Sequence, residues 1–438
     1  MKISNLKKTY FYFKRNGIKK TLGAVSERLC SPYYKNYFYN KPEEKELERQ
    51  RKEKRKSCLF SILVPAYETK EEYLRQLIDS VQSQTYPFWQ LIIADAGKSD
   101  GVKKVCNSYK EDRITYVKLE KNLGISGNTN SALEYVQGDY VGLLDHDDFL
   151  TPDALYEMEK AIKEGKDRGK EYTFIYSDED KCDETGQNFY EPHFKTDFNL
   201  DLLLTNNYVC HFLVMKSEEI QKLKLRPTYD GAQDFDLVLR AVGNLMEEKK
   251  VPEEMICHIP KVLYHWRCHN DSTAVNPESK KYAYEAGKKA LEDFCKERGW
   301  QTEVVSLPHV GFYKIIYQGD IFSQREDIAA VGGKEILRGR IINSIFDKEG
   351  HSIYQGLRES YSGYFHRAAL TQNAEALDIT KWKISPKVLE KYETFFKTDA
   401  SIDCITQEER RKKVCDFLKK EGYRLYWDPD WRIRRKKK

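Results

Sequence analysis

The chain has 438 residues, 40% of them hydrophobic and 33% charged, which supplies enough apolar material for two domain cores and excludes disorder throughout. No apolar run approaches the roughly 18 residues that span a bilayer, and the basic N-terminus lacks a small-residue cleavage site, so we expect a cytoplasmic protein without a secretory signal. The ten cysteines form no C-x-x-C pair, which favours reduced thiols over a zinc site or a disulfide framework.

The net charge of +5 conceals a segregation of charge along the chain. Residues 1–56 hold seventeen Lys and Arg against six Glu, so the remainder is negative, although its last eight residues, WRIRRKKK, are basic again. Basic ends on an acidic body predict either simple solvation or attraction to an anionic membrane surface, with peripheral attachment on its cytoplasmic face. The negative body and the lack of a recognised binding module disfavour a nucleic-acid partner.

Residues 1–57 are predicted to form a basic and aromatic arm with a charged linker. Aromatic residues cluster at 10–13 and again at 33–39, among lysines and arginines. This texture fits two structures, an interfacial amphipathic element and a helical arm that packs on the main domain. Residues 43–56 predict a charged helix or linker.

From Leu59 onward, short apolar runs alternate with helical patterns. This alternation predicts an α/β fold with a mostly parallel sheet and helices on both faces, in which ligands bind beyond the carboxyl ends of the strands. Neither G-x-G-x-x-G nor G-x-x-x-x-G-K-[ST] occurs, which disfavours a dinucleotide dehydrogenase and a P-loop NTPase. The predicted strands are 59–64, 90–94, 114–119 and 140–145, and the predicted helices are 71–84, 101–110 and 127–136.

An acidic cluster follows the apolar run at 140–145. Asp145, Asp147 and Asp148 would repel one another there unless a cation lies among them. Carboxylates suit Mn²⁺ or Mg²⁺, which would also neutralise a diphosphate that has no glycine-rich loop to bind it. Helix capping near residue 152 is the alternative for Asp153 and, in part, for Asp148.

Six landmarks in order make residues 60–300 resemble a family 2 glycosyltransferase with the GT-A fold. They are SILVPAYE, QTYPFWQLIIAD, NLGISGNTNSALEYVQGDYVGLLDHDD, YSDEDK, QDFDLVLR and IPKVLYHWR. The narrower resemblance is to the rhamnan-type branch that builds bacterial cell-surface polysaccharides. The resemblance implies transfer of a sugar from a UDP-sugar or dTDP-rhamnose donor to a saccharide or lipid-linked saccharide acceptor.

The resemblance also implies residue roles on the donor side. The nucleotide site would be lined by residues 65–68, the base would be bound by Asp95, and the metal by Asp145 and Asp147. Asp145 would also contact the ribose, while His146 points elsewhere. The donor-site residues are Pro65, Ala66, Tyr67, Glu68, Asp95, Asn122, Gly124, Asp145, His265 and Arg267, the last two facing the diphosphate.

Inverting transfer needs a base, and the resemblance assigns this role to Asp234 at the start of a helix, with Asp236 left as a helix-terminal acid. On the acceptor side, Asp178 and Glu179 are candidates, with a solvated loop as the alternative. Trp266 is either a wall for the acceptor sugar or a packing residue.

Residues 301–438 are expected to form an accessory module. PHVGFYKIIYQGD and GYRLYWDPDWRIRR resemble parts of a second GT-A domain from which the nucleotide half has been lost. We therefore expect a catalytic domain at 58–300 and a non-catalytic module that binds acceptor, partner or membrane. A non-catalytic nucleotide-sugar-binding subunit of an assembly complex is the alternative function of the whole chain.

Overall fold

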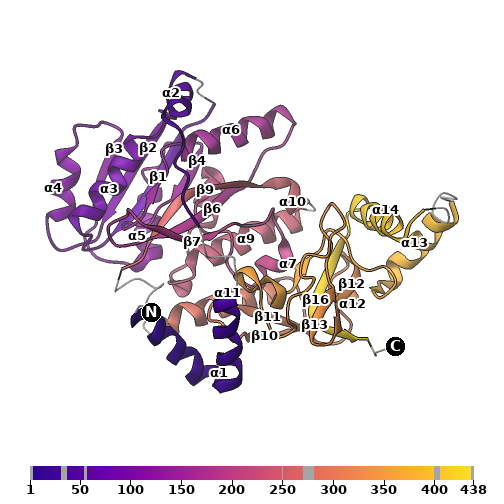
Figure 1. Ribbon diagram of the computed structural model, residues 1–438. Coiled ribbons are helices and arrows are strands. Elements are labelled where there is room, and N and C mark those ends of the chain that lie inside the picture. The colour runs from indigo at the N-terminus through magenta and orange to yellow at the C-terminus, as the bar shows by residue number, and fades with distance from the viewer. Residues whose placement is uncertain are drawn as a thin grey trace. The chain divides into compact units, whose positions relative to one another are not determined.

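The structure, a computed structural model, describes residues 3–30, 37–53, 57–248, 250–269, 281–398 and 405–435 (Figure 1). It divides into two compact units. The first comprises residues 1–8, 34–198 and 207–294, and the second comprises residues 9–33, 199–206 and 295–438. The predicted division is 1–57, 58–300 and 301–438. The structure groups residues 1–8 and 34–57 with the first unit, and residues 9–33, 199–206 and 295–300 with the second.

The first unit is built on a nine-stranded sheet with the order β3-β2-β1-β4-β8-β6-β9-β5, in which β7 pairs with β6. Its strands are β1 (Phe60–Ala66), β2 (Trp89–Asp95), β3 (Ile114–Lys118), β4 (Tyr140–Leu143), β5 (Phe149–Leu150), β6 (Phe174–Cys182), β7 (Phe189–His193), β8 (Leu213–Lys216) and β9 (Ile256–Arg267). The first four strands match the predicted ones within a few residues.

The half of the sheet formed by β3, β2, β1 and β4 is entirely parallel. Ala66 at the end of β1 lies opposite Asp95 at the end of β2, so the loops after these strands open at one edge. Beyond β4 the sheet becomes mixed, because β8 runs antiparallel to β4 and β6 while β6 and β9 are parallel. This arrangement confirms the predicted α/β class.

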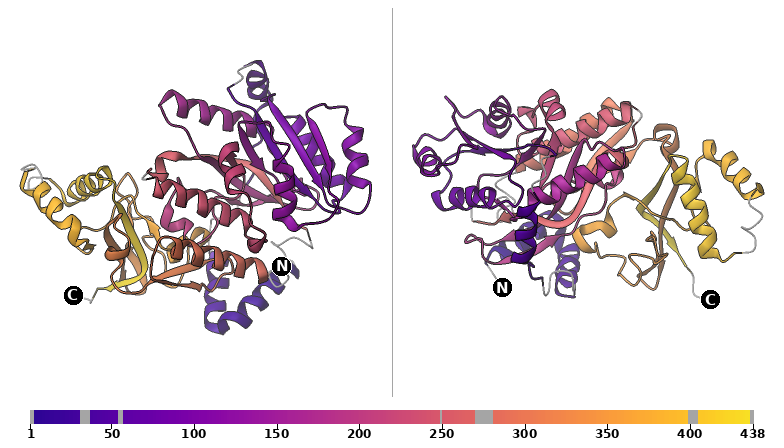
Figure 2. Two further views of the ribbon diagram at one scale, coloured as in Figure 1. Left: turned by 180° about the vertical axis from the view of Figure 1, so that it is seen from behind. Right: turned by 90° about the horizontal axis from the view of Figure 1, so that it is seen from above.

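Helices cover both faces of this sheet (Figure 2). Ile62 and Val64 of β1 pack in one core cluster with Leu77 and Ile78 of α3, while α5 also contacts β1. The helices are α2 (Glu44–Lys52), α3 (Glu71–Gln82), α4 (Gly101–Ser108), α5 (Gly124–Leu133), α6 (Ala154–Asp167), α8 (Ser217–Leu223), η1 (Pro227–Tyr229), α9 (Gln233–Glu247) and α10 (Pro252–Met255). Helix α11 (Lys281–Glu297) ends in the second unit.

The second unit has a smaller sheet with the order β13-β12-β16-β14, in which β15 pairs with β12. Val414 and Leu418 of α14 pack with Leu425 and Trp427 of β16 in its core. Its elements are most of α1 (Ile3–Cys30), α7 (Leu200–Leu203), β10 (Thr302–Ser306), β11 (Tyr313–Tyr317), α12 (Ile321–Gln324), β12 (Ile328–Leu337), β13 (Arg340–Asn343), η2 (Tyr364–Ala369), β14 (Gln372–Asn373), β15 (Lys383–Ile384), α13 (Pro386–Thr398), α14 (Gln407–Lys420) and β16 (Arg424–Arg434).

A buried charge network centred on Arg325 ties distant segments of the second unit together. Its guanidinium is ion-paired with Asp201 and Asp327, each at 2.7 Å, and donates to the Tyr317 hydroxyl at 3.0 Å. Removing one partner from such a buried group costs about 3–5 kcal/mol, so this network fixes residues 199–206 to the second unit. Among the described helices, none combines the length and apolarity that crossing a bilayer requires.

Candidate active site

Asp95 at the end of β2 is fully buried and bonded to its own loop. One carboxylate oxygen accepts from the Gly97 amide at 2.8 Å, and the other accepts from Tyr116 at 2.9 Å and Lys118 at 3.1 Å. A Cβ at Gly97 would stand 2.9 Å from the Asp95 carboxylate, so this tight loop requires glycine. The base contact of Asp95 stays a prediction, and its observed role is to shape the loop after β2.

The residues that follow β1 lie at the same sheet edge. Tyr67 is exposed, and Glu68 has a φ of 48° and accepts from the Lys98 amide at 2.6 Å. Glu68 therefore links this loop to the one after β2. Their contact with a nucleotide stays a prediction.

The start of α5 is held by a residue that the sequence did not single out. Asp230 accepts from the Ser126 amide at 3.2 Å, and its other oxygen lies less than 3.0 Å from where a Cβ on Gly124 would stand. Gly124 has a φ of 77°, and Asn122 accepts from its amide at 3.0 Å. The predicted Asn122–Gly124 loop thus depends on a glycine that admits the Asp230 carboxylate.

The acidic residues after β4 separate into exposed and buried groups. Asp145 is half-exposed and Asp147 is one-fifth exposed, whereas Asp148 is fully buried. Asp148 accepts from the Arg267 amide at 2.7 Å and from the Tyr264 hydroxyl, so it fastens the turn to β9 rather than capping a helix. Asp153 does occupy the N-cap position of α6, but its carboxylate accepts from Thr151 and not from the helix amides.

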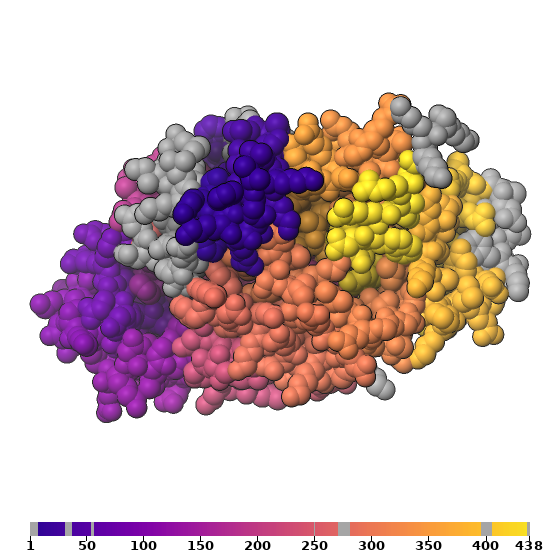
Figure 3. Space-filling view, turned by 90° about the horizontal axis from the view of Figure 1, so that it is seen from below, coloured from indigo at the N-terminus to yellow at the C-terminus, as the bar shows by residue number. Residues whose placement is uncertain are grey.

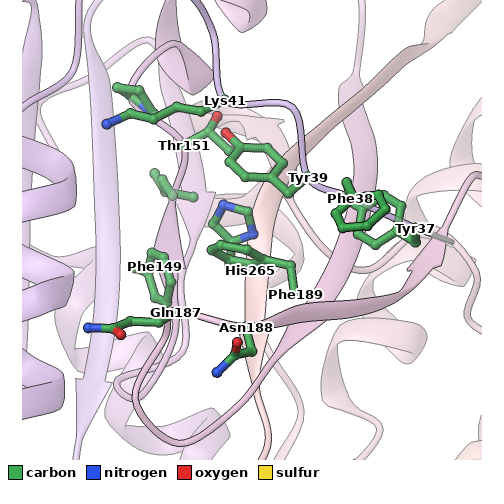
Figure 4. Close-up of a pocket in the computed structure, with 12 residues that line it drawn as sticks. Tyr37, Phe38, Tyr39, Lys41, Phe149, Thr151, Gln187, Asn188, Phe189 and His265 are labelled. Carbon is green, nitrogen blue, oxygen red and sulfur yellow. The ribbon is translucent and has the colours of Figure 1, made fainter.

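The alternation of β9 directs His265 away from the acidic cluster. Tyr264 stacks on His211, and Trp266 also contacts His211, with ring centroids 4.8 and 5.8 Å apart. His265 points to the other face, because neighbouring strand residues project oppositely. There its Nδ1 atom lies 2.6 Å from Asp180 Oδ1. With Phe149 and Phe189, His265 lines an aromatic pocket of about 600 Å³ (Figure 4).

Arg267 is also fully buried, and its side-chain donors are used within the protein. They reach the Asp147 carbonyl at 2.6 Å, the Glu184 carbonyl at 2.8 Å and the Gln76 amide oxygen. The prediction that His265 and Arg267 face the diphosphate therefore needs correction. In this structure Arg267 holds the Asp147 turn in place, and His265 belongs to the aromatic pocket.

His269, two residues past β9, contacts the acidic cluster directly. Its Nε2 atom lies 2.7 Å from Asp147 Oδ2, and its Nδ1 atom is buried without a partner among the described residues. Burial opposes ionisation, but the hydrogen bond to His269 and the proximity of His146 hold the pKa of Asp147 below its usual value. His146 itself contacts Thr69, 3.0 Å away. Two carboxylates and an imidazole nitrogen form a donor set that suits a divalent metal.

His211 connects the acidic cluster to Glu179. Glu179 Oε2 lies 2.8 Å from the His211 amide and 3.1 Å from Nδ1, while Nε2 faces Asp145 at 3.8 Å. Burial would lower the pKa of His211, but the hydrogen bond and charge of Glu179, together with Asp145, raise it to about 9. His211 is therefore a cation at neutral pH, and it offsets part of the negative charge of the cluster.

The segment that contains Asp178 and Glu179 is not a solvated loop. Both residues lie in β6 and are buried. Asp178 accepts from the Lys195 amide at 2.7 Å and pairs with His258 at 2.9 Å, which gives it a structural role. Glu179 contacts the site through His211, and the acceptor role of Trp266 stays a prediction.

Asp234 stands in the first turn of α9, beside this network. Its Oδ2 atom accepts from Asn207 at 2.9 Å, and its ligand atoms lie within 4.8 Å of those of Cys210 and His211. Asp236 is different, because it is buried and ion-paired with Arg226 and Arg240. Asp234 is thus the partly exposed carboxylate of the pair, and its charge acts on Asp145.

The arrangement brings together two functions that lie far apart in sequence. Asp145, Asp147 and His269 lie along one edge of the site, and Asp234 provides a carboxylate nearby, with His211 between the two groups. Such a site can bind an anionic leaving group at one end and accept a proton at the other.

Comparison with known proteins finds a family match that lies mostly within the first unit. Residues 61–222 match the family model described as glycosyl transferase family 2. The chain is 38% identical over 264 residues to an uncharacterized protein of Sinorhizobium fredii (59% of this chain, 28% of that protein). It is 32% identical over 252 residues to the O-antigen biosynthesis protein RfbC of Myxococcus xanthus (57% and 19%).

Further similarities are more limited in extent. A putative teichuronic acid biosynthesis glycosyltransferase of Bacillus subtilis is 35% identical over 118 residues (26% of this chain, 45% of that protein). The structure of S. aureus TarS residues 1–349 matches with 16% identity and a TM-score of 0.42, covering 55% of this chain and 65% of that one. The alignments with the first two relatives span less than a third of those proteins' length. Residues 61–222, most of which lie in the first unit, are therefore similar to glycosyl transferase family 2.

Proposed function

We propose that the chain transfers a sugar from a nucleoside-diphosphate donor to a hydroxyl group of a cell-surface polysaccharide, with inversion at the anomeric carbon. The observation that carries this proposal is the convergence of the Asp145–Asp147 edge with Asp234 through His211. Relatives named for O-antigen and teichuronic acid biosynthesis support a polysaccharide acceptor. UDP-sugars and dTDP-rhamnose are the donor classes to test.

In the proposed reaction, Asp234 takes the proton of the acceptor hydroxyl as its oxygen attacks the anomeric carbon. The bond between that carbon and the diphosphate oxygen breaks, and the nucleoside diphosphate leaves from the opposite side of the sugar. The Asn207 amide orients the Asp234 carboxylate, since it donates to Oδ2 at 2.9 Å. A positioned base of this kind contributes about 10²–10⁴-fold to the rate.

The donor set fits a divalent cation such as Mn²⁺ or Mg²⁺. The contact of His269 Nε2 with Asp147 Oδ2 at 2.7 Å supports an imidazole ligand beside that carboxylate. Asp145, Asp147 and His269 would hold the cation, with Arg267 fixing the Asp147 turn. When bound, the cation would neutralise the charge that develops on the diphosphate.

The acceptor sugar is proposed to bind against Trp266. This indole is partly exposed, lies on the same face of β9 as Tyr264, and contacts His211. Aromatic faces bind the apolar side of a sugar ring, so Trp266 would orient the hydroxyl towards Asp234. Pro65, Ala66, Tyr67, Glu68, Asp95, Asn122 and Gly124 remain the proposed donor-side residues.

Release of nucleoside diphosphate from a donor panel tests the proposal. The full chain would be assayed with Mn²⁺ or Mg²⁺ and with EDTA, beside Asp147→Ala, Asp234→Asn and the matched control Asp112→Asn, an exposed site remote from the cluster in sequence. We expect metal-dependent release with one donor and acceptor, lost in Asp147→Ala and Asp234→Asn and unchanged in the control. Donor binding without any transfer, unaffected by Asp234→Asn, would instead favour a non-catalytic nucleotide-sugar-binding subunit.

A further inference from the structure

Helix α1 shows two different faces within the second unit. One face is fixed to that unit by specific contacts. Arg15 and Asn16 each donate to the 307–308 backbone at 3.0 Å, and Ser26 lies 2.8 Å from the Tyr361 hydroxyl. Glu27 accepts from the Ser362 and Gly363 amides. The orientation of α1 on this unit is therefore determined along most of its length.

The other face carries large apolar side chains that point into solvent. Ile18, Leu22 and Val25 are 66%, 64% and 37% exposed, and their spacing of four and three residues places them in one row on a helix. Tyr10 and Phe13, which precede Gly17, are also exposed, by 59% and 43%. An apolar row that faces water costs free energy unless something covers it.

Gly17 divides α1 into two segments. It has a φ of 75° and a ψ of 172°, which interrupts the helix and shifts the phase of the following turns. A left-handed residue at this point favours glycine. The break lets each segment pack one side on the unit while apolar side chains stay exposed on the other. A single helical period fitted to residues 3–30 would therefore not detect the apolar row formed by Ile18, Leu22 and Val25.

The exposed row lies among positive charges. Lys14 lies beside Tyr10 and Lys19 follows Ile18, both of them exposed, and Glu27, the single acidic residue of α1, is already bonded to residues 362–363. Figure 3 shows α1 in indigo and the C-terminal segment in yellow on one face of this unit. Arg434 and Arg435 near that end are ion-paired with Glu359 and Glu335, so the lysines of α1 provide the charge that is available for a partner.

We infer that the exposed side chains of α1, which are Tyr10, Phe13 and Lys14 before Gly17 and Ile18, Lys19, Leu22 and Val25 after it, dock on an anionic lipid bilayer. Apolar side chains flanked by lysines match the acyl boundary and the phosphate headgroups of such a surface. A second copy of the chain fits less well, because its own lysines would be brought against these. Docking would hold the second unit at a membrane, within reach of a lipid-linked form of the saccharide acceptor in the proposed function.

Vesicle co-sedimentation of the full chain tests this docking. We expect binding to phosphatidylcholine vesicles that contain phosphatidylglycerol, and at least about tenfold weaker binding to phosphatidylcholine alone. The Ile18→Glu/Leu22→Glu double variant should lose at least about tenfold in binding to the anionic vesicles. Ile353→Glu, at a 51% exposed position of the same unit outside α1, is the matched control and should bind like the wild type.

Two further measurements separate the possible outcomes. Neutralising Lys14 and Lys19 to Gln should also weaken binding, and thermal unfolding of every variant should match the wild type because the replaced side chains are exposed. Transfer to a soluble acceptor should be unchanged in the α1 variants, so failure of the proposed function leaves the vesicle result interpretable. Absence of vesicle binding, equal binding by the double variant, or a dimer that this variant abolishes would overturn the inference.

Discussion

Replacing Gly124 by alanine tests how the start of α5 is held. Alanine in the left-handed region, at the φ of 77° seen here, costs about 1–2 kcal/mol. The new Cβ would also displace the Asp230 carboxylate, whose bond to the Ser126 amide is worth about 1.5–3 kcal/mol as a charged hydrogen bond. We therefore expect Gly124→Ala to lower the free energy of unfolding by about 3–5 kcal/mol.

Gly169 is the matched control, because its φ of 71° is similar and nothing lies within 4 Å of the added Cβ. Gly169→Ala should cost only the backbone term of about 1–2 kcal/mol, and so should Gly124→Ala in an Asp230→Ala background. Urea denaturation followed by circular dichroism measures all four variants against the wild type. If Gly124→Ala and Gly169→Ala differ by less than about 0.5 kcal/mol, the contact with Asp230 has no energetic weight and the reasoning is refuted.

Three further predictions concern catalysis, metal binding and pH. Asp234→Asn should keep donor affinity, measured by calorimetry, and lower turnover by about 10²–10⁴-fold, and unchanged turnover would exclude it as the base. His269→Ala should weaken the apparent Mn²⁺ affinity of donor turnover by about 10-fold or more, whereas an unchanged metal titration would remove it from the donor set. Burial lowers the pKa of His309 to about 4 in the folded protein. Between pH 6.5 and 4, His309 therefore stays neutral in the folded protein but binds a proton in the unfolded chain. The free energy of unfolding should therefore fall between pH 6.5 and 4, by about 2 kcal/mol at pH 5, and His309→Gln should remove that part of the loss in urea denaturation at pH 7 and 5.

Much of the first unit could be predicted because its signals are local. The apolar runs at 59–64 and 90–94 predict buried strands, since a strand covered on both faces has no polar side. Asp145 and Asp147 could be singled out because carboxylates directly after a buried run have no packing explanation. These inferences need only neighbouring residues.

The assignments that needed correction depend on side-chain direction. The motif at 264–267 predicts that His265 and Arg267 face the donor diphosphate. In the structure the twofold alternation of β9 sends His265 away from the cluster and leaves Tyr264 and Trp266 beside His211. Arg267 is charged, yet its donors bind Asp147, Glu184 and Gln76 within the protein.

The sequence by itself determined the α/β class, the positions of the first four strands and the acidic residues after β4. The tertiary structure alone decided that His269 meets Asp147, that His211 links Glu179 to Asp145, and that Asp230 holds the start of α5. The physical reason is separation along the chain: Asp147 and His269 lie 122 residues apart. No periodicity or local spacing predicts such a pair, because only the pairing of β9 with β5 and β6 brings the two side chains within hydrogen-bonding distance.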